Sequence, residues 1–290
     1  MQCAGVAHCI PFLVADNHNE REESRMKGAI IGDIIGSIYE FDNIKTKDFP
    51  LFGKKCFFTD DSVMTVAIAD ALLSTRGRDD DTIRDVMQMR MRRYGQTYPG
   101  RGYGGHFLDW LYQDDPKPYN SCGNGSAMRV SPVGFFANSE EECIRLATLS
   151  AQPSHNHPDG IKGAVATALC IYTALTTKDR DKVVEVCRRY YPYDFCLDEI
   201  RPEYYFGHFQ ALCAGTVPYA VQAFAESTSF EDAIRNVVSI GGDTDTLAAI
   251  TGPIAEAYYG VPEELWETAS GYLSEEIRDV VNRFYSEIEK

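Results

Sequence analysis

The sequence predicts an all-α fold from three observations. Apolar residues recur at the spacing of a helix along much of the chain, and in residues 62–74, for example, Val63 and Val66 share one face. No stretch of five or more residues alternates strictly between apolar and polar side chains, as a half-buried strand would. Helix N-cap signals also recur, because Ser139 and Ser229 each stand three residues before an acidic residue.

The expected helices follow from these patterns along the chain. A glycine-spaced apolar helix precedes Glu40, and residues 62–74 form the next helix. Further helices are expected after Ser139, at 161–175, 182–190 and 218–225, after Ser229, at 246–259 and after Ser274. Gly252 and Pro253 predict a kink or a new segment within 246–259. Loops are expected at roughly 40–61, 95–126, 151–160 and 191–208, and loops of that length usually serve a functional site.

The length of 290 residues allows one large domain or two modest ones. No internal repeat or long Ser/Pro-rich linker divides residues 26–290, so we expect a single domain there. Residues 1–25 begin with an apolar patch, lack the basic region of a signal peptide and continue as a polar stretch. We therefore expect residues 1–25 to be a disordered N-terminal extension and Met26 to be the natural start.

The composition excludes several classes of function. Lys and Arg number 28 and Asp and Glu number 43, which gives a net charge of −15. Such a surface repels nucleic-acid backbones and anionic lipids. The longest uncharged apolar run, residues 163–177, is shorter than the ~18 residues that a membrane span needs. The nine cysteines form no CxxC pair, which favours reduced, core-filling thiols in a cytoplasmic protein.

Two acidic clusters each open an expected helix: Thr59, Asp60 and Asp61, and Asp243, Thr244, Asp245 and Thr246. One such cluster alone is explained by N-capping. Two clusters exceed what capping needs, and Gly241 and Gly242 permit a tight backbone path into the second. If the two helix starts meet, four carboxylates and up to three hydroxyls converge and need cations. Oxygen ligands without His or Cys favour a pair of Mg²⁺ or Mn²⁺ ions.

Three further motifs each have a structural and a functional interpretation. The segment Gly32–Glu40 fits close helix packing with a surface carboxylate, or a functional Glu40. The glycine-rich turn Ser121–Arg129 is a structural turn or a cradle in which backbone N–H groups bind phosphate. The motif of His155 and His157 has three interpretations: a pair of metal ligands, a helix cap or a substrate contact.

Taken together and in this order, the motifs resemble the ADP-ribosylglycohydrolase family. The resemblance covers residues 26 to about 275 and rests on six segments: 32–40, 58–62, 102–105, 123–129, 154–155 and 241–246. It implies an orthogonal helical bundle with two Mg²⁺ or Mn²⁺ ions at its centre. It also implies hydrolysis of the glycosidic bond between ADP-ribose and a modified acceptor, either a protein side chain or a small molecule, with release of ADP-ribose. The expected partners include nucleic acid only as an ADP-ribosylated substrate, and they do not include a membrane.

The resemblance assigns roles to individual residues. The expected metal ligands are Thr59, Asp60, Asp61, Asp243, Asp245 and Thr246. The expected catalytic residues are Glu40, Asp60 and Asp61. Substrate contacts are expected from Tyr103 and Gly104 beside the distal ribose or adenosine, from Ser121, Cys122, Gly123, Asn124 and Gly125 around the pyrophosphate, and from His155 in the cleft.

One departure from the family bears on the mechanism. The nitrogenase-regulating members carry an aspartate in the stretch that corresponds to Gly100–His106, which here contains no acid. The sequence therefore favours the glutamate-dependent arrangement of the serine-type members. Two alternatives stay open: a non-catalytic member like the lens crystallins, and a two-metal hydrolase of nucleotides or phosphoesters.

Overall fold

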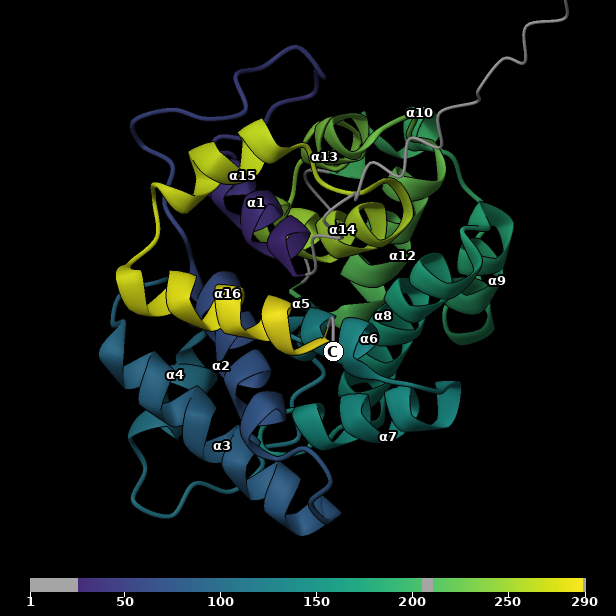
Figure 1. Ribbon diagram of the computed structural model, residues 1–290. Helices are drawn as coiled ribbons and strands as arrows, with labels where there is room; N and C mark the ends of the chain where they lie inside the picture. Colours follow the sequence, from purple (N-terminus) through teal and green to yellow (C-terminus); the bar gives the residue numbers. More distant parts are fainter. Residues whose placement is uncertain (1–25, 205–210, 289–290) are drawn as a thin grey trace, which may run out of the picture.

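The computed structural model describes residues 26–204 and 211–288, and this part of the chain is helical without a β-strand, as predicted (Figure 1). The expected disordered extension, residues 1–25, lies outside the described residues. The helices are α1 (Lys27–Gly36), α2 (Asp60–Ser74), α3 (Asp80–Thr97), α4 (Gly105–Tyr112), α5 (Gly125–Met128), α6 (Ser131–Phe136), α7 (Glu140–Ala151), α8 (Pro158–Thr177), α9 (Arg180–Tyr190), α10 (Leu197–Ile200), α12 (Cys213–Ala225), α13 (Phe230–Val238), α14 (Thr244–Tyr259), α15 (Glu263–Ser270) and α16 (Glu275–Ile288).

The predicted helices are present, but several boundaries were wrong and two of the predicted loops contain helices. Ser139 and Ser229 cap α7 and α13 as expected, each accepting a backbone N–H three residues on. α12 begins already at Cys213 and carries Pro218 inside it. Short helices α4 and α10 lie within stretches predicted to be loops. α4 has eight residues, of which Phe107, Trp110 and Leu111 are buried, so its apolar pattern is too short to stand out in the sequence.

Three glycines of α1 form a stripe along which α14 packs at backbone distance (Figure 1). A Cβ atom at Gly28, Gly32 or Gly36 would lie 2.4, 2.1 and 2.4 Å from the carbonyl oxygens of Gly252, Ala248 and Thr244, respectively. The two helices are therefore antiparallel, and the end of α1 lies against the start of α14. This contact places the loop after α1 beside the second acidic cluster.

α14 is a single helix through Gly252 and Pro253, so the predicted new segment does not form. Its residues are buried from Thr244 to Ala257. Tertiary packing on α1 and its other neighbours therefore overrides the helix-breaking preference of the Gly-Pro pair. Gly252 itself serves this packing, because a Cβ there would lie 2.0 Å from the carbonyl oxygen of Gly28.

α8 is long and apolar enough to cross a membrane by length and composition, and 61% of its 18-residue apolar window is buried inside the molecule. The seven cysteines of the described residues are unpaired, and five of them are buried, as the composition predicted.

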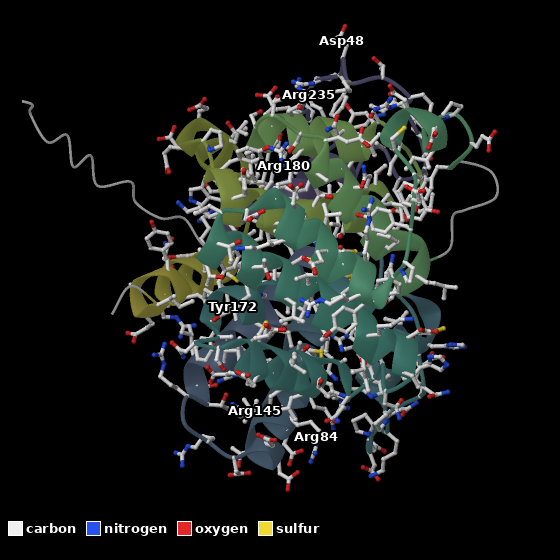
Figure 2. The ribbon with its side chains drawn as sticks, turned by 90° about the vertical axis from the view of Figure 1, so that its right-hand side faces the viewer. Asp48, Arg84, Arg145, Tyr172, Arg180 and Arg235 are labelled. Carbon is white, nitrogen blue, oxygen red and sulfur yellow. The ribbon has the colours of Figure 1, made fainter. Side chains whose placement is uncertain are left out.

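Many of the charges pair at the surface. Arg84 and Arg145 lie at the same end of the molecule in Figure 2, and Arg145 Nη1 is 2.5 Å from Asp80 Oδ1.

Candidate active site

A cleft of about 470 Å³ opens where α2, α5 and α14 begin. Its lining also includes the loop after α1 and the glycine-rich loop before α4. The residues that line it are Glu40, Phe41, Phe57, Thr59, Asp60, Asp61, Gly100, Arg101, Gly102, Gly104, Gly105, His106, Phe107, Tyr119, Ser121, Gly123, Asn124, Gly125, Met128, Arg129, His155, Ala211, Asp243, Asp245 and Thr246. Most of the predicted site residues are among them, whereas Tyr103 and Cys122 are not.

The two acidic clusters meet in this cleft. Thr246 Oγ1 donates to Asp61 Oδ2 across 3.4 Å, which joins the start of α14 to the start of α2. Carboxylate oxygens of Asp33, Asp61 and Asp245 lie within 4.8 Å of one another. Oxygens of Glu40, Asp243 and Asp245 form a second such group. The convergence on which the metal hypothesis depended is therefore present.

Thr244 is the member of the second cluster that turns away from the cleft. Its hydroxyl donates to the Gly36 carbonyl at 2.9 Å and so ties α14 to α1. Two of the three threonines considered, Thr59 and Thr246, remain at the acidic group.

Asp33 is a buried member of the acidic group that the sequence analysis left without a role. Its carboxylate accepts hydrogen bonds from the backbone N–H and the hydroxyl of both Thr59 and Ser62. Burial raises the pKa of Asp33 to about 6, although these hydrogen bonds act in the opposite direction. A single carboxylate inside an otherwise apolar, glycine-spaced helix was the signal that could have identified it.

Four other carboxylates of the cleft, those of Glu40, Asp60, Asp61 and Asp245, also resist ionisation. Loss of hydration, and then the charges of neighbouring carboxylates, raise the pKa values of Asp60, Asp61 and Asp245 well above the ordinary range. Burial, followed by the charges of Asp243 and Asp33, raises the pKa of Glu40 to about 7. Repulsion of this kind is relieved when cations bind between the carboxylates.

The donor set fits a hard divalent cation. All side chains of the two acidic groups offer oxygen, which suits Mg²⁺ or Mn²⁺. Asp61 Oδ1 is buried and, within the described part of the chain, has no hydrogen-bond partner. An anionic oxygen left in this state is costly unless a ligand completes its environment.

The loop that carries Glu40 is fastened to the start of α14. Asn43 Nδ2 donates to the carbonyl oxygens of Tyr39 and Glu40, both at 2.6 Å, and Asn43 Oδ1 accepts from the Gly242 N–H at 2.6 Å. Gly241 and Gly242 have φ values of 76° and 77°, which confirms the predicted tight backbone path. Glu40 is thus held beside the second cluster.

The glycine-rich turn is positioned by backbone pairing and by a link to the acidic group. Asn124 N–H donates to the Ala211 carbonyl at 3.0 Å, and the Cys122 carbonyl accepts from Cys213 N–H at 3.2 Å. Asn124 Nδ2 donates to Asp243 Oδ2 at 2.7 Å. Cys122 lies in this backbone pairing and does not line the cleft.

The aromatic end of the cleft differs from the prediction. The hydroxyl of Tyr103 donates to the Tyr98 carbonyl at 3.0 Å, and Tyr103 does not line the cleft. His106, Phe107 and Tyr119 line it instead. The sequence analysis missed these rings because they lie in and beside α4, which was expected to be a loop.

The two histidines of the His-x-His motif have separate environments. His157 caps α8, where Nδ1 accepts from the Asp159 N–H at 3.1 Å. His155 is buried, and its Nδ1 is 2.8 Å from Ser154 Oγ. Among the described residues, neither histidine belongs to a group of three metal-ligating side chains. The cap and the cleft position are therefore favoured over a metal pair.

Comparisons with known proteins identify the family of this chain. The family model described as ADP-ribosylglycohydrolase matches residues 17–290. The chain is 27% identical to ADP-ribosylhydrolase ARH3 from Homo sapiens, over 87% of this chain and 90% of that protein. It is 24% identical to ADP-ribosylarginine hydrolase Tri1 from Serratia proteamaculans, over 86% of this chain and 75% of that protein.

A solved structure shares the fold. The chain named ADP-ribosylglycohydrolase-related protein complex superposes with a TM-score of 0.66 at 24% identity, covering 92% of this chain and 99% of that one. The all-α architecture and the matched family model lead to one assignment: the chain belongs to the ADP-ribosylglycohydrolase family.

Proposed function

We propose that the protein is a metal-dependent hydrolase that cleaves the glycosidic bond between ADP-ribose and a modified acceptor. The observation that carries this proposal is the meeting of the two acidic clusters beside Glu40 and the glycine-rich turn in one cleft. Its substrate is an ADP-ribosylated protein or small molecule, and its product is free ADP-ribose. The names of the relatives, ADP-ribosylhydrolase and ADP-ribosylarginine hydrolase, support the same reaction class.

Two Mg²⁺ or Mn²⁺ ions are the proposed cofactors. The residues that would hold them are Thr59, Asp60, Asp61, Asp243, Asp245 and Thr246. When bound, the cations supply positive charge that neutralises these carboxylates and orients the ribose hydroxyls. Asp33 has a supporting part in this proposal, because the hydrogen bonds that it accepts fix Thr59 and the first turn of α2.

Glu40 is the proposed general base. Its carboxylate lies in the cleft beside Asp243 and Asp245, the proposed metal ligands, where it can accept a proton from an attacking water. Glu40 takes one proton from the water as its oxygen forms a bond to C1 of the distal ribose. The bond from C1 to the acceptor breaks, and the acceptor leaves with the proton that Glu40 then gives up. Asp60 and Asp61 lie in the same cleft and are the proposed groups that position the water.

The glycine-rich turn is the proposed diphosphate site. Ser121, Gly123 and Gly125 line the cleft, and the N–H groups at the start of α5 are suited to bind anions. Asn124 connects this turn to Asp243 by its side chain. Binding of the diphosphate and placement of the distal ribose at the carboxylates are thereby coupled through one residue.

The proposed mechanism is of the glutamate-dependent, serine type. The loop from Gly100 to Gly105 lines the cleft with four glycines and Arg101, and it contains no acid. The Arg101 guanidinium stacks 3.7 Å from the centre of the Phe58 ring, and its Nη1 donates to the Phe58 carbonyl. Because the loop from Gly100 to Gly105 offers no carboxylate, Glu40 is the carboxylate outside the two acidic clusters that is proposed to act on the substrate.

Product analysis tests the proposal. The protein and Mg²⁺ are incubated with peptides ADP-ribosylated on serine or on arginine and with ADP-ribosylated nucleic acid, with EDTA controls. Release of ADP-ribose in the presence of metal is the expected result. AMP or inorganic phosphate as the product would support the phosphoester hydrolase instead, and bound metal without any turnover would support the non-catalytic alternative.

A further inference from the structure

Arg129 is a buried cation at the floor of the cleft. It is 1% exposed, and no carboxylate of the described residues forms an ion pair with it. Its Nη2 donates to the Ser150 carbonyl at 2.7 Å and to Ser154 Oγ at 3.0 Å. Burial lowers the pKa of Arg129 to about 10, so the guanidinium stays charged at neutral pH.

The Ser154 hydroxyl connects Arg129 to His155. A guanidinium can only donate, so Ser154 Oγ accepts from Arg129. The hydroxyl has one further hydrogen-bond partner among the described residues, and this partner is the acceptor available for the serine proton. That partner is His155 Nδ1, at 2.8 Å. We therefore infer that Nδ1 is the unprotonated nitrogen of the ring, because the serine proton would otherwise have no acceptor among the described residues, and in the neutral imidazole Nε2 then carries the proton. Burial and the charge of Arg129 both lower the pKa of His155, which keeps the ring neutral.

His155 Nε2 faces the glycine-rich turn. It lies 2.9 Å from the position that a Cβ would take at Gly125 and 3.5 Å from that position at Gly123. Both glycines line the cleft together with His155. A proton on Nε2 therefore presents a hydrogen-bond donor to whatever occupies the space above the turn, whereas a proton on Nδ1 would present a lone pair.

We propose that Arg129 and Ser154 are positioning residues that fix His155 as a neutral Nε2–H donor toward the diphosphate of the ligand. The identity of the ligand as a diphosphate rests on the proposed function, whereas the hydrogen bonds that link Arg129, Ser154 and His155 do not depend on it. An anionic ligand needs a donor at this place, since the other tautomer would set a lone pair against a phosphate oxygen. Glycine at 123 and 125 keeps the space in front of Nε2 open.

The first test is the tautomer of His155 in the unmodified protein. The histidines are labelled with ¹⁵N, and two-dimensional spectra that correlate ring nitrogens with ring protons are recorded at neutral pH. A His155→Asn variant assigns the signals of this ring among the six histidines. A protonated Nε2 with an unprotonated Nδ1 is the expected result, and a proton on Nδ1 would overturn the proposal. This readout requires neither metal nor substrate.

The second test removes the connecting hydroxyl. Ser154→Ala is expected to let the Nδ1–H form appear in the spectrum and to weaken ADP-ribose binding, measured by calorimetry, by about tenfold. Ser131→Ala is the matched control, because Ser131 is a buried serine two positions after Arg129 whose hydroxyl has no hydrogen-bond partner among the described residues. It should leave both readouts unchanged.

The outcomes of the two tests are separable. Unaltered tautomer and affinity in Ser154→Ala would overturn the role of Ser154. If the unmodified protein does not bind ADP-ribose at all, the proposed function fails, and the spectrum still decides the tautomer. If Ser154→Ala does not fold, shown by loss of cooperative thermal unfolding, the spectrum of the unmodified protein decides the proposal.

Discussion

The starts of α2 and α14 contain the same kinds of residue but use them differently. At α2, Thr59 accepts from the Asp61 N–H, and Asp33 of another helix accepts from the N–H groups of Thr59 and Ser62. At α14, no side chain caps the helix from the N-cap position, and the Thr244 hydroxyl is used to bind α1. The start of α2 is therefore capped in part by Asp33 of α1, whereas the start of α14 is held by its packing on α1.

The comparison shows how carboxylates at a helix start can remain available to bind a ligand. Aspartates at a helix start usually satisfy the free N–H groups of the first turn. Here Asp33 takes over much of that task at α2, so Asp61 keeps a buried oxygen without a hydrogen-bond partner among the described residues. At α14 the close contact of Gly36 with Thr244 and Asp245 fixes the helix start, Asp243 does not cap the helix, and one oxygen of Asp245 accepts from the Thr246 N–H at 2.9 Å. The following predictions test this division of tasks.

The largest effect is expected from the carboxylates themselves. Asp245→Ala and Asp60→Ala should each lower turnover by about a thousandfold or more and weaken metal binding, because each removes an anionic oxygen from the proposed metal site. The measurements are ADP-ribose release and Mn²⁺ binding by calorimetry. Thr244→Val is the control, since the Thr244 hydroxyl faces α1, and it should retain turnover within about twofold. Equal turnover in Asp245→Ala and Thr244→Val would contradict the assignment.

Glu40 should affect rate more than metal occupancy. Glu40→Ala is expected to lower turnover by about a hundredfold, the usual contribution of a general base, while Mn²⁺ binding stays close to that of the unmodified protein. Single-turnover release of ADP-ribose and calorimetry with Mn²⁺ measure the two quantities. Full activity in this variant would remove Glu40 from the catalytic residues, and complete loss of metal binding would make it a ligand instead.

Asp33 should contribute more to stability than an ordinary cap. Asp33→Ala removes an acceptor shared by four hydrogen bonds in the core and should lower the free energy of unfolding by about 2–4 kcal/mol. Ser139→Ala removes a single cap at the start of α7 and should cost about 1 kcal/mol. Urea unfolding measures both. Equal losses would show that Asp33 acts as an ordinary cap.

The smallest effect is the pH dependence of the metal-free protein. Folding raises the pKa of Asp33 from 3.8 to about 6 and that of Glu40 from 4.5 to about 7. The native state therefore holds protons that the unfolded chain releases, and this contribution to stability is present below the ordinary pKa values and is lost as the pH rises through the raised ones. The Tm of EDTA-treated protein should therefore fall between pH 4 and 7, and Mg²⁺ should restore it. A metal-free Tm that rises steadily over this range would contradict the prediction.

The sequence was sufficient for features that are local. The capping residues Ser139 and Ser229, and the two acidic clusters, are each visible within a few neighbouring positions. Positive φ at Gly241 and Gly242 was predictable because only glycine adopts such backbone angles freely. The all-α class followed from the same kind of local pattern.

Features that depend on distant contacts were not predictable. Asp33 acts on Thr59 and Ser62, which lie on another helix, so its role needs the packing of α1 to be known. The Gly-Pro pair at 252–253 is accommodated because α1 supports it from one side. Tyr103 was predicted as a substrate contact from its motif alone, whereas only the three-dimensional course of the loops shows that Tyr119 lines the cleft and Tyr103 does not.

Metal-dependent release of ADP-ribose tests the central claim most directly. A peptide ADP-ribosylated on serine is incubated with EDTA-treated protein, and free ADP-ribose is quantified before and after addition of excess Mg²⁺. We predict no release before the addition and sustained release after it, with ADP-ribose as the nucleotide product. Release that does not change on adding Mg²⁺, or AMP as the product, would contradict the assignment of a metal-dependent glycohydrolase.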